Sequence, residues 1–148
     1  MNTTATEKPK PLPAKPLPDR TDPDNAPFWE ATDKGVLLVK LCGDCSKYHW
    51  PPRVGCSHCG SGNVEWTETA PRGTIFSWTI VHRSQTPGFG AEVPYAVLLV
   101  ELNEAPGVRM IGNLVGAGIE AVEAGRAVEG VFTPAPDGSA TLVNWKPA

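Results

Sequence analysis

The chain carries Cys42-Gly-Asp-Cys45, then ten residues, then Cys56-Ser-His-Cys59, and this stretch decides its fold. All four cysteines of the 148-residue chain lie in these two pairs. Zn²⁺ favours four thiolates at tetrahedral corners, and a gap of two residues lets both cysteines of one tight turn reach the same ion. The spacing therefore predicts a zinc ribbon in which Cys42, Cys45, Cys56 and Cys59 bind one zinc ion.

Three other interpretations of these cysteines stay open at this point. Two disulfides would need an oxidising compartment, and the chain does not open with a signal peptide. A thioredoxin-like redox pair would need a Cys-x-x-Cys in a βαβ setting, which is missing here. His49 or His58 could also replace one cysteine as a ligand. The gap of ten residues is shorter than the roughly fifteen to twenty that are usual, although a compact ribbon accommodates it.

The zinc is expected to be structural. Four protein ligands leave no coordination position open for water or substrate. A module this small buries too little apolar surface to fold unaided, so metal binding, worth about 10–16 kcal/mol in small zinc modules, supplies its folding energy. We therefore expect one Zn²⁺ per chain, with no catalytic role.

The segment before the cysteines predicts a tail and a short helix. Residues 1–24 are rich in proline and poor in large apolar groups, which predicts a disordered, polyproline-like tail. A helix is expected over 25–35, because Asp24 or Asn25 can cap its start and Gly35 can end it in a left-handed conformation.

Two aromatic residues make this helix unable to stand alone. Phe28 and Trp29 are too apolar for an isolated short helix in water, so the helix must pack on this protein's own body or on a partner. The aliphatic run over 36–41 then predicts a strand that leads into the first cysteine.

The second half of the chain predicts a small barrel. Stretches of β-branched and aliphatic residues alternate with turn signals such as Pro106-Gly107. Five strands with one helical turn after the third, over 119–124, match the OB-fold, a small Greek-key barrel. The fold class is thus mainly β. We expect the tail over 1–24, the helix and zinc ribbon over 25–69 and the OB-fold over 70–148, with strands over 73–81, 95–102, 108–115, 127–132 and 141–145.

The first barrel strand divides its side chains between two faces. Because successive side chains of a strand point to opposite sides, Phe76, Trp78 and Ile80 should share one face. The period of two favours a core position for Phe76 and Trp78. The opposite face would then carry the remaining side chains, Ile75, Ser77, Thr79 and Val81.

Charge argues against a dedicated nucleic-acid binder, which normally has a basic face. The chain carries 13 Lys and Arg against 16 Asp and Glu, a net charge of −3. Over 28–148 the count is nine basic against twelve acidic residues, again −3. Nucleic-acid binding nevertheless remains the alternative function, since both OB-folds and zinc ribbons serve that purpose in other proteins.

The chain also lacks signals for a membrane and for catalysis. Its longest apolar runs are about half a dozen residues, too short to span a bilayer, which predicts a cytoplasmic protein with no membrane partner. It has three histidines, His49, His58 and His82, and neither a Gly-x-Ser-x-Gly elbow nor a P-loop. The glycine cluster over 112–118 is interpreted as a strand end and turn. An enzyme acting without a partner, such as a hydrolase or acyltransferase, is the less favoured alternative.

Several motifs in fixed order resemble one family. They are the two Cys-x-x-Cys pairs and four further stretches: Trp50-Pro-Pro-Arg53, Arg72-Gly-Thr-Ile-Phe-Ser-Trp-Thr79, Val81-His-Arg83 and Pro94-Tyr95. Over about residues 25–146 the chain is similar to the zinc-ribbon/OB-fold proteins of acyl-CoA metabolism, long known as a domain of unknown function. The tail before residue 25 is not part of that pattern.

The resemblance implies a function. Members of this family pair a helix and a rubredoxin-like zinc ribbon with an OB-fold, and they are commonly accessory subunits of thiolase-fold enzymes. The partner carries the catalytic residues, and the accessory subunit holds the complex together and can help to bind coenzyme A. The resemblance therefore implies a non-catalytic subunit in a hetero-oligomer around a thiolase dimer, taking part in thiolysis, aldol cleavage or acyl transfer on an acyl-CoA.

The segment over 82–95 is the candidate contact region for a ligand or partner. His82 and Arg83 follow the first barrel strand, and the Arg guanidinium is a fork-shaped donor suited to phosphate or amide groups. Phe89 lies in a loop with two glycines, and Tyr95 follows that loop. Alternatively, Arg83 is a solvated strand end and the loop is a flexible connector. Coenzyme A thioester is the ligand that the resemblance suggests for this region.

Overall fold

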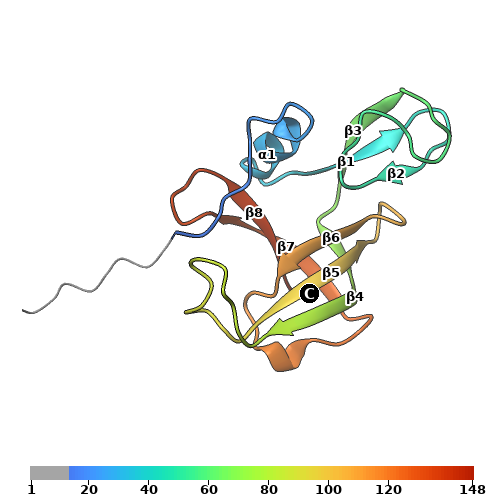
Figure 1. Cartoon of the computed structure of the whole chain (residues 1–148). Coiled ribbons are helices and arrows are strands. Elements are labelled where there is room, and N and C mark those ends of the chain that lie inside the picture. Colours follow the sequence, from blue (N-terminus) through green and yellow to red (C-terminus); the bar gives the residue numbers. More distant parts are fainter. Residues whose placement is uncertain (1–13) are drawn as a thin grey trace, which may run out of the picture.

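The computed structural model describes residues 14–148, which form a short helix and two antiparallel sheets (Figure 1). The three-stranded sheet lies beside the helix, and the five-stranded sheet curls beneath both. In chain order the elements are α1 (Ala26–Thr32), β1 (Leu37–Cys42), β2 (Tyr48–His49), β3 (Val64–Thr69), β4 (Arg72–Val81), β5 (Tyr95–Leu102), β6 (Arg109–Asn113), the 3-10 turn η1 (Ile119–Ala121), β7 (Ala127–Pro134) and β8 (Thr141–Pro147).

Helix α1 is shorter than expected and packs on the protein's own body. Asn25 is its N-cap residue but makes no side-chain capping bond; instead its amide donates to the carboxylate of Asp22 at 2.6 Å. Gly35 adopts φ +73°, which confirms the predicted left-handed end of this segment. Phe28 is buried, and its ring centroid lies 4.6 Å from that of Trp50. Burial of this ring explains how so short a helix is stable.

The three-stranded sheet carries the cysteines and has the order β2-β1-β3. Strand β1 pairs with β3 along its whole length, from Leu37 opposite Thr69 to Cys42 opposite Val64. The Lys40 ammonium lies 4.7 Å from the ring centroid of Trp66, its cross-strand neighbour. Strand β3 was not predicted from the sequence. It fixes β1, and therefore the first cysteine pair, by six backbone pairings.

The five-stranded sheet has the order β6-β5-β4-β7-β8. A parallel bridge between Leu114 and Trp145 joins its two ends, and the amide of Val115 donates to the carbonyl of Trp145 at 2.8 Å. This closure gives the five-stranded Greek-key barrel of an OB-fold, with η1 after the third strand as expected. The mainly β fold class is confirmed. Gly112 permits the closure, because a Cβ there would lie 2.6 Å from the carbonyl oxygen of Val143.

A β-bulge in β4 overturns the predicted division of its side chains. Ile75 pairs with Val100 but Ser77 pairs with Leu99, so Phe76 is an extra residue on β4. The extra residue shifts the inward and outward alternation of the side chains by one position. Phe76 therefore does not share a face with Trp78 and Ile80. Residues that are directly paired share a face, so Ser77 and Thr79 lie on the outer side with the outward residues of β5.

The predicted core positions of Phe76 and Trp78 are therefore wrong. Phe76 is 49% exposed on the outer face. Trp78 pairs with the fully buried Leu98 and so shares its face, yet it remains 41% exposed. The reason is that β7 pairs with β4 only over Arg72–Thr74, so the half of β4 that carries Trp78 has a free edge.

One hydrophobic core connects the two sheets. Phe28 of α1 and Leu37 and Val39 of β1 belong to the same buried cluster as the barrel residues. The largest buried barrel side chain is Trp145, which is fully inaccessible to solvent. Because this cluster is continuous, the barrel supports the elements that carry the cysteines.

The expected disordered tail over 1–24 stays a prediction. Residues 1–13 lie outside the described residues. Residues 14–24 form irregular chain and turns, in which the guanidinium of Arg20 donates to the Asp33 carboxylate at 2.6 Å and to the Ser139 carbonyl at 2.5 Å. The domain boundary near residue 70 likewise stays a prediction.

Candidate metal centre and adjoining cleft

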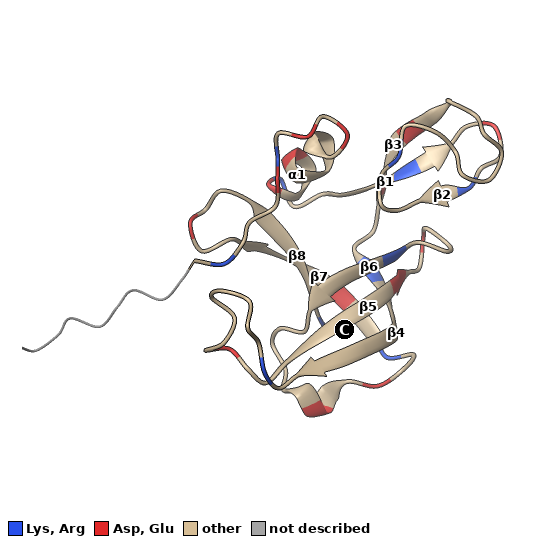
Figure 2. Cartoon of the chain, viewed as in Figure 1, with Lys and Arg blue, Asp and Glu red and all other residues tan. Residues whose placement is uncertain are grey.

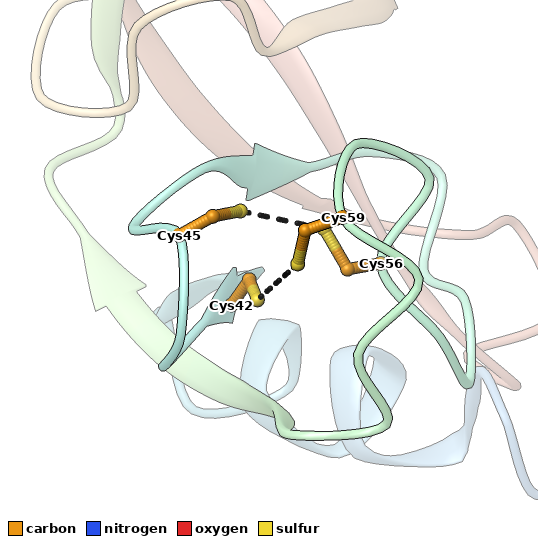
Figure 3. Close-up of side chains that lie close together, drawn as sticks. All are labelled: Cys42, Cys45, Cys56 and Cys59. Atoms are coloured by element: carbon orange, nitrogen blue, oxygen red, sulfur yellow. Dashed lines mark hydrogen bonds between the residues drawn. The ribbon is translucent and has the colours of Figure 1, made fainter.

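The four cysteine thiols converge at one end of the three-stranded sheet. Their sulfur atoms all lie within 4.8 Å of one another (Figure 3). The Sγ atoms of Cys42 and Cys59 are 3.7 Å apart, and those of Cys45 and Cys56 are 3.5 Å apart. Two sulfurs bound at about 2.3 Å to one tetrahedral ion lie about 3.8 Å apart. The cluster therefore has the size of a four-thiolate zinc site.

Two similar backbone turns present the thiols. The amide of Cys42 donates to the carbonyl of Lys47, and the amide of Cys56 donates to the carbonyl of Ser61, each five residues ahead. Cys42 and Cys56 are buried, whereas Cys59 is exposed. The first cysteine of each pair is therefore inside the protein and the second is nearer to solvent, so the metal site lies at the edge of the ribbon.

The two turns are tied together by hydrogen bonds between side chains. Asp44, in the first turn, accepts hydrogen bonds from the hydroxyl of Ser61 and, at 3.1 Å, from the amide of Asn63. Gly43 has no side chain to block this contact; a Cβ there would lie 2.5 Å from the Asn63 amide nitrogen. A side chain at position 43 would therefore displace the Asn63 amide from Asp44.

The thiols affect one another's ionisation. Desolvation acts to raise the pKa of the Cys56 thiol. Hydrogen bonds from the backbone amides of Cys59 and His58 and from neighbouring thiols act in the opposite direction and are stronger in total, so the pKa is lowered to about 5. For Cys59, the Ser61 amide acts to lower the pKa, yet the adjacent Cys56 and the other thiols raise it to about 12. Several thiolates can share this space only if a cation neutralises them, which is what Zn²⁺ does.

The histidines lie beside the cluster of sulfur atoms. The rings of His49 and His58 have centroids 5.3 Å apart, and the backbone amide of His58 donates to Cys56 Sγ at 3.4 Å. The Nδ1 atom of His49 is 3.5 Å from the hydroxyl of Ser57, a long contact. The compact ligand set among the described residues consists of the four cysteines.

Residues 82–94 form a long loop between β4 and β5, and Tyr95 is the first residue of β5 (Figure 1). The centroids of Phe89 and Tyr95 lie 6.0 Å apart, and the Lys15 ammonium lies 4.7 Å from the Phe89 centroid. His82 and Arg83 are exposed immediately after β4. The structure thus brings Phe89 and Tyr95 together, while His82 and Arg83 remain at the strand end.

An apolar cleft of about 520 Å³ lies between α1, the ribbon and the barrel. Its charged lining residues are Asp19 and Asp22, and its lining includes no Lys or Arg of the described chain. Phe89 is the one sequence-predicted contact residue that reaches it. The full lining is Pro18, Asp19, Asp22, Asn25, Phe28, Trp29, Trp50, Pro51, Pro52, Phe89, Met110, Ile111, Gly112, Asn113, Leu142, Val143 and Asn144.

Most of this cleft was not predicted from the sequence. Its walls come from segments that are about 90 residues apart in the chain, such as Trp50 and Leu142, so local patterns give no signal for it. Ile111 is an exception. It lies between Arg109 and Asn113 on the outward side of β6, and alternation alone could have indicated its exposure.

A zinc ribbon on a helix, joined to a five-stranded OB barrel, defines the class of protein to which this chain belongs. Residues 29–65 match the family model described as the rubredoxin-like zinc ribbon domain of ChsH2, and residues 66–133 match that of the ChsH2 C-terminal OB-fold domain. The chain is also 36% identical to the DUF35 domain-containing scaffold protein of Pyrococcus furiosus, over 69% of this chain and 73% of that protein. The protein is a member of the ChsH2/DUF35 family.

Two further relatives are larger proteins. The chain is 37% identical over 142 residues to a probable enoyl-CoA hydratase alpha subunit of Thermomonospora curvata, which covers 96% of this chain and 42% of the relative. It is 33% identical over 141 residues to the 3-oxo-4,17-pregnadiene-20-carboxyl-CoA hydratase alpha subunit of Mycobacterium tuberculosis, covering 88% of this chain and 43% of the relative. The chain spans less than half the length of these two proteins.

Solved structures show the same fold. A chain of the Ltp2-ChsH2(DUF35) aldolase superposes with a TM-score of 0.75 at 34% identity, covering 90% of this chain and 98% of that one. A DUF35 protein from Sulfolobus solfataricus superposes with a TM-score of 0.62 at 17% identity, covering 86% and 87% of the two chains. The zinc ribbon and OB-fold predicted from the sequence are thus confirmed, and relatives of this chain are subunits of acyl-CoA hydratases and of an aldolase.

The helices of the described residues do not include one that is long and apolar enough to cross a bilayer.

Basic and acidic residues are scattered over the described part of the chain (Figure 2). The prediction that nucleic acid is not the partner stays a prediction.

Proposed function

We propose that this protein is a non-catalytic, zinc-stabilised accessory subunit of a thiolase-fold enzyme that forms or cleaves a carbon–carbon bond of an acyl-CoA. The observation that carries the proposal is the pairing of a closed four-cysteine site with relatives that are named as enzyme subunits or as a scaffold. A site with four protein ligands has no free position for a substrate, so the metal stabilises the fold.

The described residues offer little for catalysis by this chain alone. The single serine hydroxyl near a histidine is that of Ser57, and its 3.5 Å contact with His49 is longer than a catalytic pair requires. The Nε2 atom of His49 is buried without a hydrogen-bond partner among residues 14–148, so no carboxylate orients the ring. The reaction is therefore assigned to the partner subunit.

Coenzyme A is proposed as a ligand shared with the partner. The cleft suits its phosphates poorly, because Asp19 and Asp22 face the same space. His82 and Arg83 at the end of β4 are the better candidates for phosphate contact, and the Phe89–Tyr95 pair is the candidate for the adenine. We also propose a cytoplasmic location, where reducing conditions keep the four thiols available for zinc.

The test is reconstitution. The chain is co-expressed with the thiolase-like protein that is encoded nearest to its gene, and the pair is analysed by size-exclusion chromatography and by acyl-CoA turnover. We expect a hetero-oligomer whose turnover exceeds that of the partner alone. Three controls accompany it: the chain alone, the partner alone, and the partner with Cys59→Ser. Turnover by the isolated chain, or a partner that is equally soluble and active alone, would contradict the proposal.

A separate measurement tests the ligand residues. Arg83→Ala should raise the KM for the acyl-CoA in the reconstituted complex several-fold and leave kcat nearly unchanged, because it removes binding that ground state and transition state share. Arg126→Ala is the matched control, since Arg126 is an exposed arginine whose guanidinium contacts the Ala121 carbonyl at 3.0 Å outside the 82–95 loop. An unchanged KM for Arg83→Ala would remove this residue from the ligand site.

A further inference from the structure

The bulge in β4 creates an apolar surface on the outside of the barrel. Phe76 is displaced outward by the bulge and joins the outward side chains of the two neighbouring strands. On β5 these are Val97 and Leu99, and on β6 the outward residue opposite Leu99 is Ile111. Ile111 is 71% exposed and Phe76 is 49% exposed. We call Phe76, Val97, Leu99 and Ile111 the outer apolar face.

This face carries little charge. In Figure 2 the ribbons of β4, β5 and β6 are tan along most of their length, with charged positions near their ends. The charges at one end of the face are Glu101 and Arg109, which pair at 2.8 Å. The Arg109 guanidinium also stacks on the Phe76 ring, 3.5 Å from its centroid. A protein that covers the face would bury an ion pair that is already neutralised.

The outer apolar face continues into the cleft. Ile111 belongs to both, since it also lines the cleft together with Trp29, Trp50 and Pro51. Phe76 does not line the cleft. The exposed apolar surface therefore extends from a concave aromatic region at the helix and ribbon, over β6, to the outside of the barrel around Phe76.

The shape of this surface selects a folded protein as its occupant. A small molecule in the cleft would leave Phe76 exposed, whereas a protein can cover the cleft and the neighbouring outside of the barrel together. Large apolar and aromatic side chains with an Arg beside them form the usual centre of a protein interface. Asp19 and Asp22 at the cleft favour a partner with basic groups beside an apolar ridge. A second copy of this chain is a poorer match, because the basic residue on its outer apolar face is Arg109, which already forms an ion pair with Glu101.

We propose that the outer apolar face and the adjoining cleft are the surface on which the catalytic partner subunit docks. The inference rests on the proposed function and adds the location of the contact. Phe76 and Ile111 form the centre of the contact, and the partner places a basic side chain near Asp19 and Asp22.

The test measures affinity between purified, zinc-loaded chain and the thiolase-like protein encoded nearest to its gene, by biolayer interferometry. Ile111→Asp and Phe76→Ser should each weaken binding at least tenfold, because a charge or a lost aromatic ring at the centre of an interface removes much of its stability. Both residues are exposed, so the variants should fold; zinc content and thermal unfolding check this. Val54→Asp is the matched control, because Val54 is 76% exposed in the ribbon loop outside this surface, and it should bind as the wild type does.

Each result has a distinct meaning. If the wild type binds and both variants bind equally well, the docking surface is wrong while the proposed function stands. If the wild type itself does not bind, the proposed function fails and this surface has no partner. A chain that dimerises alone and becomes monomeric with Ile111→Asp would show that a second copy covers the face, which would also overturn the proposal.

Discussion

Ser46 and Gly60 occupy equivalent positions in the two cysteine turns. Each stands four residues after the first cysteine of its pair, and each donates its amide to that cysteine's carbonyl at 2.9 Å. Both adopt a left-handed backbone, with φ +58° at Ser46 and +76° at Gly60. The turns thus impose the same conformation on two different residues, although only glycine adopts it without steric cost.

This equivalence predicts opposite effects of two substitutions. Ser46→Gly should stabilise the zinc-loaded protein or leave it unchanged, because it relieves a left-handed non-glycine residue. Gly60→Ala should destabilise it by about 1–2 kcal/mol, the cost of placing a Cβ in this conformation. Urea unfolding of both variants at saturating zinc gives the two free energies. Equal destabilisation by both would show that the turns are not equivalent.

Loss of one thiolate is expected to unfold the ribbon. Cys42→Ser and Cys59→Ser each leave three sulfur ligands, so we expect less than one zinc per chain by elemental analysis and loss of the β1–β3 sheet by NMR. Much of the roughly 10–16 kcal/mol that zinc contributes to such modules would be lost. Ser57→Ala, next to a ligand but outside the ligand set, is the control. Retention of one tightly bound zinc in both cysteine variants would contradict the assignment.

The Asp44 contacts predict a pH dependence with a defined sign. Hydrogen bonds from Ser61 and Asn63 lower the pKa of Asp44 below its ordinary value of 3.8. A carboxylate whose folded-state pKa is lowered adds stability that is complete above its unfolded-state pKa and is lost as the pH falls through the folded value. Asp44→Asn should therefore be less stable than the wild type at pH 7.

The measurement is the difference in unfolding free energy between wild type and Asp44→Asn at several pH values with excess zinc. This difference should stay constant from about pH 7 to 5, since the carboxylate remains ionised there. It should shrink only below about pH 4. A difference that already disappears at pH 5 would contradict the lowered pKa of Asp44, and one that stays unchanged well below about pH 4 would show that Asp44 does not act through its charge.

Two phenylalanines should respond differently to truncation. Phe28→Ala removes a buried ring that packs on Trp50 and should cost about 3–5 kcal/mol. Phe76→Ala removes an exposed ring and should cost less than about 1 kcal/mol. Thermal and urea unfolding of the two variants compare them directly. A large cost for Phe76 would mean that the core side of β4 has been assigned to the wrong residues.

Sequence patterns predicted the parts of the fold that local chemistry decides. The spacing of Cys42, Cys45, Cys56 and Cys59 requires that they meet, because a single ion can satisfy them only together. The barrel strands were found because each is a β-branched or aliphatic run bounded by turn residues. Gly35 ends the helix segment for a reason that is visible in one residue, its tolerance of positive φ.

The features that were missed depend on pairing between distant segments. The face on which Phe76 lies is set by where β5 shifts register, which alternation within β4 does not reveal. Strand β3 is stabilised by β1, from which it is separated by the whole cysteine loop. The cleft has the same origin, since its walls come from the helix, the ribbon and both ends of the barrel.

The extra residue in β4 also changes which positions tolerate mutation. Up to Ile75 the buried positions are odd-numbered, whereas beyond Ser77 the core-facing positions, Trp78 and Ile80, are even-numbered. Deleting residue 76 would restore strict alternation, leave the other side chains of β4 on their present faces and remove the Phe76 ring from the exterior. In a comprehensive mutational scan, the positions of β4 that do not tolerate polar residues should therefore be odd-numbered before residue 76 and even-numbered after it. Homologues that lack the extra residue should present a different outer surface.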